Sequence, residues 1–463
     1  MTDTQERAPA PPSGGGGSGL DSFFKLTERG TTVGTEIRAG LTTFLVMAYI
    51  IFVNPNILSA APGGPDPNAV AAGTALVAGL LCILMGLVAN APVAMAAGLG
   101  INAAVAFGLV ANDGLTYEGA MGVIVLEGLI VAALVLVGLR EAIMNAVPMA
   151  LKRAIGVGIG LFILFIGFVN GDLIVGTANE DTAPVSFVFP NTPGAWVTLI
   201  GLLITVILYA RKVRGALIIS ILATTVVALI WDVAAIPDTF SATPDFSTLG
   251  AFDLGNVFTQ LGFVAAALTI FSFMLTDFFD TMGTATAITE QAGLVDEEGN
   301  FEAIGRLLFV DSVGAAAGGA AGVSSNTSYI ESSAGVAEGG RTGLTAVVVG
   351  VLFLIAIFLA PLAGIVPPQA TAPVLILVGF LMSGLIKGID FDDFEEGFPA
   401  LLAIVLMPLT FSITVGIGAG FVMYTLIKVV KGKAREVHPL MWAVAIAFVI
   451  FFAQDVLGAA ISA

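Results

Sequence analysis

Residues 344–365 read LTAVVVGVLFLIAIFLAPLAGI, a long run without a charged side chain. An α-helix rises about 1.5 Å per residue, so this run is long enough to cross the roughly 30 Å hydrocarbon core of a bilayer. Similar apolar runs recur along most of the chain. The sequence therefore predicts an all-α polytopic membrane protein.

The composition supports the same class. Of the 463 residues, 57% are hydrophobic and only 11% are charged, whereas an average soluble domain is about 25% charged. So few charges cannot cover a water-soluble surface, which excludes a soluble enzyme. The formal charge of −17 disfavours nucleic acid as a partner. A membrane β-barrel is excluded as well, because it would show short strands of alternating polarity.

Apolar runs bounded by proline, glycine and charge predict fourteen spans. A further apolar segment, 439–460, either spans the membrane or lies along it. Residues 1–20 are expected to form a disordered tail, since they are rich in Pro, Gly and Ser. Residues 20–30 can form a short surface helix. The predicted spans are 36–59, 68–90, 91–111, 117–139, 155–174, 194–210, 214–236, 258–283, 305–322, 323–340, 341–365, 370–388, 396–412 and 414–430.

The positions of lysine and arginine test this count, because cytoplasmic loops are enriched in them. With the N-terminus in the cytoplasm, all 17 fall on the cytoplasmic side. We therefore expect a plasma-membrane protein with a cytoplasmic N-terminus and two short spans within 396–430. The predicted outer loops, which hold no Lys or Arg, are 60–67, 112–116, 175–193, 237–257 and 366–369.

One short motif occurs twice. Ala-Gly-x-x-x-Asn ends at Asn102 in the third predicted span and at Asn326 in the tenth. The copies lie seven spans apart, and an odd number of spans inverts one half relative to the other. Inverted repeats with interrupted, Gly-rich segments at matching positions point to the midplane site of a secondary transporter.

Two aspartates stand late in the eighth predicted span, in TDFFDTMGT (276–284). Asp277 and Asp280 are three residues apart and share one face of a helix, where they can bind a donor-rich ligand, a proton or a cation. The alternative is that they only cap the helix near its cytoplasmic end. Gly283 permits a close backbone approach, which favours a functional role for Asp280.

The tenth predicted span contains VSSNTSYIES (323–332), whose polar side chains and Glu331 make a poor lipid-facing helix. The stretch suggests extended backbone that turns into a helix. Such backbone is tolerated at membrane depth only where it is buried or lines a cavity. Polar packing between helices would explain the serines but not Glu331.

Other polar residues carry weaker signals. Asn102 lies in a pliable polar spot of the third span. Glu127 and Asp311 are isolated carboxylates, and we expect them to be structural partners of neighbouring hydroxyls rather than ligand contacts. His438 and Cys82 are the only histidine and cysteine, so no metal site and no disulfide is predicted. The sequence also has no phosphate-binding loop for ATP, and no cofactor is expected.

Five segments resemble the AzgA-like azaguanine/hypoxanthine permeases, the purine branch related to the nucleobase–ascorbate transporters. The resemblance covers nearly all of residues 35–440, and the motif in the tenth span is highly specific. The segments are TEIRAGLTTFLVMAYIIFVNPNIL (35–58), MAAGLGINAAVAF (95–107), TDFFDTMGT (276–284), TSYIESSAGVAEGGRTGLTAVV (327–348) and LMPLTFSITVGIGAGF (406–421).

This resemblance implies fourteen spans in two inverted repeats of seven, with short strands that begin spans three and ten and meet antiparallel. It also implies a core domain that moves against a gate domain, and makes a homodimer plausible. The expected divisions are a tail (1–20), a first core segment with spans 1–4 (21–140), a first gate segment with spans 5–7 (141–240), a second core segment with spans 8–11 (241–366), a second gate segment with spans 12–14 (367–436) and an extra hydrophobic segment (437–463).

By motif, the resemblance places the carboxylates that bind the base at Asp280 and Glu331. Together with Asp277, they are also expected to couple transport to an ion. Thr284 stands where some uracil carriers have a histidine, which leaves the route of a coupled proton open. The other expected substrate contacts are Ile101, Asn102, Thr284, Ile330 and Ser332.

The expected function is therefore symport of adenine, guanine or hypoxanthine into the cell, with H⁺ or with Na⁺. A carrier of the same architecture could instead move uracil, xanthine or an inorganic anion, although Asp280 and Glu331 count against an anion. An intramembrane aspartyl hydrolase is disfavoured because its Tyr-Asp and Gly-x-Gly-Asp strings are absent. A passive channel is disfavoured because gathered carboxylates suit an occluded site.

Overall fold

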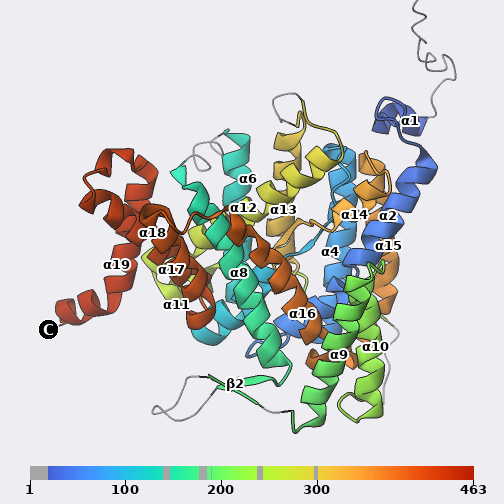
Figure 1. Ribbon diagram of the computed structural model, residues 1–463, viewed down its shortest axis with the longest axis horizontal. Coiled ribbons are helices and arrows are strands. Elements are labelled where there is room, and N and C mark those ends of the chain that lie inside the picture. Colours follow the sequence, from blue (N-terminus) through green and yellow to red (C-terminus); the bar gives the residue numbers. More distant parts are fainter. Residues whose placement is uncertain are drawn as a thin grey trace, which may run out of the picture.

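The computed structural model describes residues 19–138, 146–176, 185–188, 190–236, 243–296 and 301–462. Most of the predicted tail and the domain boundaries expected at 140/141 and 240/241 lie outside these residues. The described chain is almost entirely helical. Figure 1 shows α1 (Gly19–Phe24) and the strand β2 (Ile174–Gly176) at opposite ends of the long helices.

The first half of the chain contains both short and long helices and the strands β1, β2 and β3. Four of the helices begin at side-chain caps, where Thr32, Asp66, Thr116 and Thr192 accept hydrogen bonds from backbone amides one turn or less ahead. The elements after α1 are α2 (Val33–Met47), α3 (Ile50–Leu58), α4 (Pro67–Val88), β1 (Met95–Ala97), α5 (Leu99–Ala103), the π-helix η1 (Ala104–Asn112), α6 (Tyr117–Leu136), α8 (Met149–Asn170), β2, β3 (Val185–Phe187), α9 (Pro193–Ala210) and α10 (Ala216–Ile230).

The second half of the chain contains the longest helix, α12. Its elements are α11 (Leu254–Leu261), α12 (Phe263–Gln291), α13 (Ile304–Ala320), β4 (Asn326–Ser328), α14 (Ser332–Ala337), α15 (Gly343–Ala356), η2 (Ile357–Ile365), α16 (Pro368–Met382), η3 (Ser383–Gly388), α17 (Phe394–Thr410), α18 (Ile413–Val430), η4 (Ala434–Glu436) and α19 (Pro439–Ser462).

Among the described residues, nine helices are long and apolar enough to cross a membrane. Three shorter apolar helices accompany them, at 99–112, 216–230 and 439–453. These helices confirm the polytopic helical class. The count of fourteen spans and the inversion of the two halves remain predictions.

The structure corrects the expected course of two segments and adds a detail to a third. The first predicted span, 36–59, is present as one candidate span, Val33–Leu58. It tightens between α2 and α3 at Ala48–Tyr49, where Ile51 N–H donates to the carbonyl of Ala48 only three residues back. The predicted outer loop 175–193 contains the β2–β3 hairpin. The eighth predicted span continues to Gln291, because the helix persists after the apolar run ends at 283. Asp277 and Asp280 therefore lie inside α12 and do not cap it.

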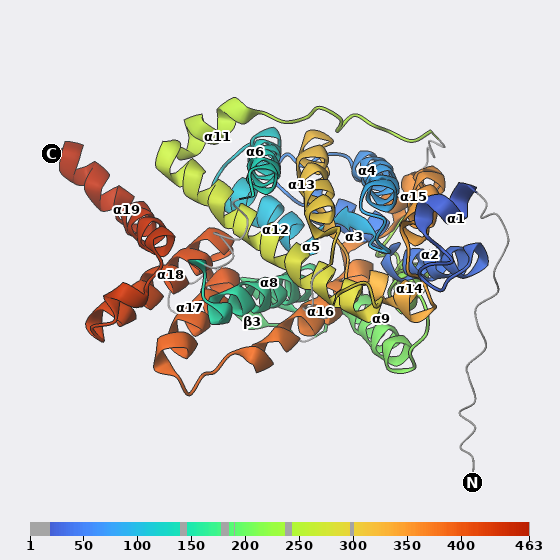
Figure 2. The same cartoon turned by 90° about the horizontal axis from the view of Figure 1, so that it is seen from above.

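The helices pack mainly within two groups. In the first group α4 packs against α15 and α6 against α13, and in the second α8 packs against α16 and α17. Figure 2 shows α6 beside α13 and α4 beside α15. Small residues allow these close contacts, since Gly86 meets Gly343 and Gly160 meets Gly379 backbone to backbone. Fewer contacts join the groups, chiefly those of α5 and α12 with α8 and of α12 with α18.

Candidate functional site

Two strands meet where the third and tenth predicted spans are interrupted. β1 pairs antiparallel with β4, and Ala96 lies opposite Thr327. Both strands are buried throughout. Two further backbone bonds extend the pair, from Gly98 N–H to the carbonyl of Ser325 and from Tyr329 N–H to the carbonyl of Ala94. The pairing satisfies peptide groups that have no helical partner, which is what broken spans require at membrane depth. The expected antiparallel strands are confirmed.

Two carboxylates lie beside this strand pair. Asp280 is exposed on α12, although the residues from 272 to 278 of the same helix are all buried. Glu331 is partly exposed in the turn between β4 and α14, next to the half-exposed side chain of Ile330. The two carboxylates are close enough to interact electrostatically. The structure thus brings together two acids from segments that lie about fifty residues apart in the chain.

Sequence reasoning missed one direct partner of this pair. The hydroxyl of Tyr49, on the tightened turn between α2 and α3, donates to Oε1 of Glu331 at 2.7 Å. Tyr49 is only 1% exposed. A buried tyrosine hydroxyl usually finds a hydrogen-bond partner, so a tyrosine inside an apolar span was the available signal. Tyr49 does not bond to Oε2, the other carboxyl oxygen of Glu331.

Asp311 holds the strand pair to α12. Its Oδ1 accepts from the backbone N–H and the hydroxyl of Ser328, each at 2.8 Å, and its Oδ2 accepts from Thr281 at 2.6 Å. The hydroxyls of Thr281 and Thr327 lie 2.7 Å apart. The expectation that Asp311 is a structural partner of hydroxyls is confirmed.

The same expectation stays a prediction for Glu127, whose carboxyl has the hydroxyl of Ser325 nearby. This side chain, on α6, is fully buried, yet neither of its carboxyl oxygens has a hydrogen-bond partner among the described residues. Asp277 on α12 is 1% exposed and accepts one bond, from the hydroxyl of Ser325 at 3.3 Å. Asp277 therefore lies on the inner side of α12, whereas Asp280 is open.

The remaining candidates are more enclosed. Asn102 is fully buried on α5, the helix that follows β1, and both polar atoms of its amide are without partners in the described structure. Ile101 and Thr284 are buried as well. The hydroxyl of Ser332 accepts from the N–H of Ala94 at 2.9 Å and donates to the carbonyl of Tyr329 at 2.6 Å, so it braces the strand pair. Their roles in binding remain predictions.

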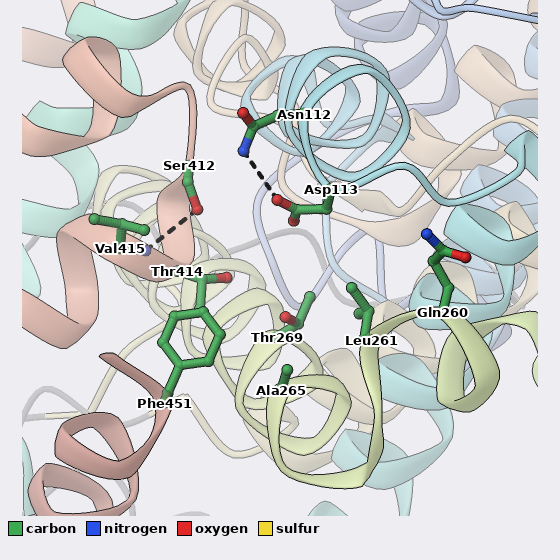
Figure 3. Close-up of a pocket in the computed structure, with 10 residues that line it drawn as sticks. All are labelled: Asn112, Asp113, Gln260, Leu261, Ala265, Thr269, Ser412, Thr414, Val415 and Phe451. Carbon is green, nitrogen blue, oxygen red and sulfur yellow. Dashed lines mark hydrogen bonds between the residues drawn. The ribbon is translucent and has the colours of Figure 1, made fainter. Parts of the chain in front are cut away.

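A separate pocket of about 260 Å³ lies at the other end of α12. Figure 3 shows Thr269 of α12 and Thr414 of α18 facing it, with the carboxylate of Asp113 bonded to Asn112. Burial raises the pKa of the Asp113 carboxyl, and the Asn112 bond opposes this change. None of the predicted site residues lines this pocket. Within the described residues, no group of three or more His, Cys, Asp or Glu could hold a metal ion.

Helical spans broken by paired strands beside a carboxylate pair define the class as a membrane transporter. The chain belongs to the Permease family (Xan_ur_permease), whose model matches residues 34–419. It is therefore a permease and not an enzyme.

Two relatives and one solved structure are similar over most of their lengths. The adenine permease AdeQ of Escherichia coli (strain K12) is 43% identical over 93% of this chain and 95% of its own. The guanine/hypoxanthine permease PbuG of Bacillus subtilis (strain 168) is 41% identical over 94% and 99%. The transmembrane domain of the cyanobacterium bicarbonate transporter BicA matches with a TM-score of 0.61 and 16% identity, over 83% of this chain and 96% of that domain. BicA shows the fold alone.

Proposed function

We propose that this protein imports purine nucleobases (adenine, guanine or hypoxanthine) together with protons, and that Asp280 and Glu331 bind the base. The carboxylate pair beside the strands carries the proposal, because it is open where its surroundings are buried. The named substrates of AdeQ and PbuG support a purine. BicA carries an anion, but two neighbouring carboxylates disfavour one here.

A neutral purine suits this pair chemically. Its ring N–H and exocyclic groups are donors, and a carboxylate can accept two donors side by side. The hydroxyl of Tyr49 occupies Oε1 of Glu331, which fixes the side chain and directs its remaining acceptor sites toward the base. A ligand without matching donors would leave these acceptors unpaired, so the site can discriminate strongly among bases.

Transport follows from movement of one helix group against the other. The first group, with α2–α6 and α12–α15, contains both acids and corresponds to the expected core. The second, with α8–α10 and α16–α18, corresponds to the gate. Sparse contacts between the groups and the antiparallel pairing of β1 with β4 support alternating access by two inverted halves of seven spans. We further propose a plasma-membrane dimer with a cytoplasmic N-terminus.

Proton coupling follows from the same carboxylates. An acid that binds both a proton and a base links the two by a coupling free energy, so a proton gradient can drive accumulation of the base. Sodium is the second candidate, since Asp280 and Glu331 could also coordinate a cation.

Uptake of radiolabelled adenine and hypoxanthine into proteoliposomes under an imposed pH gradient tests the proposal. We expect accumulation by the full-length protein, and its loss in Asp280→Asn and Glu331→Gln. Asp113→Asn, the same change in the separate pocket, should transport normally. Normal transport by either site variant would refute the assignment. Accumulation driven only by a sodium gradient would show that the coupling ion is sodium and not the proton.

A further inference from the structure

Glu127 is buried in a way that its sequence context does not explain. It lies on α6, which packs against α12 and α13, and its carboxyl is entirely shielded from solvent. Neither Oε1 nor Oε2 has a hydrogen-bond partner within the described residues. An unpaired carboxylate in such a place would lose its hydration without compensation, and a group so placed takes up a proton instead. Glu127 therefore holds a proton in this conformation.

The groups that face Glu127 are two acids and a hydroxyl. Asp277 approaches from α12 and Asp311 from α13. No salt bridge among the described residues joins a lysine or arginine to any of the three acids. η1 and α11, which also contact α6, carry no ionisable side chain. Cations therefore do not neutralise the cluster.

The two neighbouring acids differ in hydrogen bonding. Asp311 accepts three hydrogen bonds, which stabilise its ionised form. Asp277 accepts one, from Ser325. The Ser325 hydroxyl is also near the carboxyl of Glu127, without reaching hydrogen-bond geometry. Of the two acids, Asp277 is thus the partner able to exchange a proton with Glu127, and Ser325 lies between them.

Close packing limits other routes to Glu127. A Cβ added at Gly128 would collide with the backbone of Ala316 on α13, so α6 and α13 are in direct contact beside Glu127. Asp277, by contrast, is one helical turn from Asp280, which is exposed. A proton that enters from water at Asp280 can therefore reach the cluster along α12.

We propose that Glu127 is a further proton-carrying residue of the transport cycle, which exchanges its proton with Asp277 through the hydroxyl of Ser325. In the exchange, Ser325 passes its hydrogen to Oδ1 of Asp277 and takes the proton of Glu127. Glu127 becomes a carboxylate, Asp277 becomes a carboxylic acid and Ser325 is unchanged. The cluster keeps its total charge. This inference rests on the proposed proton-coupled purine transport.

Glu127→Gln distinguishes a carrier of protons from a permanently neutral side chain. Glutamine has the shape of protonated glutamate but cannot release a proton. The full-length protein in proteoliposomes is compared in two assays with radiolabelled adenine, exchange at equal pH and accumulation driven by a pH gradient. Glu127→Gln should exchange adenine at a rate near that of the wild type. Its accumulation ratio should fall to about one, as for an uncoupled carrier.

Further variants distinguish a role of Glu127 in proton coupling from a role in helix packing. Glu127→Asp keeps a titratable group and should retain some of the accumulation. Ser325→Ala removes the hydroxyl that relays the proton and should lose accumulation in the same way as Glu127→Gln. If Glu127→Gln does not fold, Ser325→Ala still tests the inference. Asp113→Asn, in the separate pocket, is the matched control and should behave as the wild type.

The outcomes are distinct. Wild-type accumulation by Glu127→Gln would show that Glu127 is permanently neutral and would overturn the inference. If Glu127→Gln lost both adenine exchange and adenine binding, its role would lie in packing and the inference would be overturned. Uptake of adenine by the wild type without movement of protons would also overturn the inference. No purine binding by the wild type would instead refute the proposed function itself.

Discussion

The hydroxyl of Tyr49 donates a 2.7 Å hydrogen bond to Oε1 of Glu331 across 282 residues of sequence. The bond joins the break in the first predicted span to the break in the tenth. It therefore couples the position of Glu331, the carboxylate that we propose to bind the substrate, to the turn between α2 and α3. Any movement of that turn would release or reorient Glu331.

Tyr49→Phe should weaken purine binding without unfolding the protein. It removes one hydrogen bond to a charged group and preserves the ring, which predicts roughly tenfold weaker affinity. Equilibrium binding of radiolabelled hypoxanthine measures this change. Tyr209→Phe, at the exposed end of α9, is the control. Equal affinity in wild type and Tyr49→Phe would mean that Glu331 does not need this bond.

Asp311→Ala should lower the free energy of unfolding, because Asp311 holds the strand pair and does not contact the substrate in our proposal. Three donors, from Ser328 and Thr281, would lose their acceptor inside a buried site. Each buried unsatisfied group costs about 1–3 kcal/mol. Thermal unfolding in detergent should therefore show a clearly lower midpoint. An unchanged midpoint would show that the strand pair does not depend on Asp311.

Gly100→Ala should hinder the conformation seen here. A Cβ at Gly100 of α5 would collide with Cγ2 of Ile159 on α8, where the two helix groups meet. Overpacking of this kind costs about 1–3 kcal/mol, so uptake should slow. The double variant Gly100→Ala with Ile159→Ala should recover much of the rate. Gly384→Ala, which meets no atom within 4 Å, should have no effect. A double variant as slow as the single one would place the defect elsewhere.

Glu395 gives a prediction about acid stability. It lies just before the predicted span 396–412, and hydrogen bonds from Lys428, Lys433 and Lys431 lower the pKa of its carboxyl to about 2. Because this pKa lies below the unfolded value near 4.5, the stabilisation is complete above pH 4.5 and is lost as pH falls toward 2.

Thermal midpoints at several pH values test this prediction. Glu395→Gln should be less stable than the wild type at pH 7, and the difference should shrink below pH 4.5. Glu28→Gln, which breaks only an exposed pair with Lys25, should match the wild type at every pH. A difference between Glu395→Gln and wild type that stays constant to pH 3 would contradict the account.

Several features were predictable from residues close in sequence. The polar run around Glu331 indicated extended backbone, and the long apolar runs indicated membrane-spanning helices. Other features depend on residues far apart. Asp280 is open while Asp277 is enclosed because Ser325 and the helices α6 and α13 cover one side of α12. Such differences within one helix cannot be read from its own sequence.

Tyr49 and Glu127 show the same limit. The partner of Tyr49 lies in the other half of the chain, so no local pattern indicates it. Glu127 resembles Asp311 in sequence, as a single acid in an apolar span, yet Asp311 accepts three hydrogen bonds and Glu127 accepts none in the described structure. Only the fold distinguishes an acid that is held by hydrogen bonds from one that accepts none.

Equilibrium binding of radiolabelled hypoxanthine to the purified full-length protein tests the central claim most directly, with unlabelled adenine, guanine, uracil and sulphate as competitors. We expect saturable binding that adenine or guanine displaces and that uracil and sulphate do not, with binding lost in Asp280→Asn and in Glu331→Gln. Absence of hypoxanthine binding at every pH and sodium concentration, or undiminished binding by both variants, would contradict the assignment of this carboxylate pair to purine recognition.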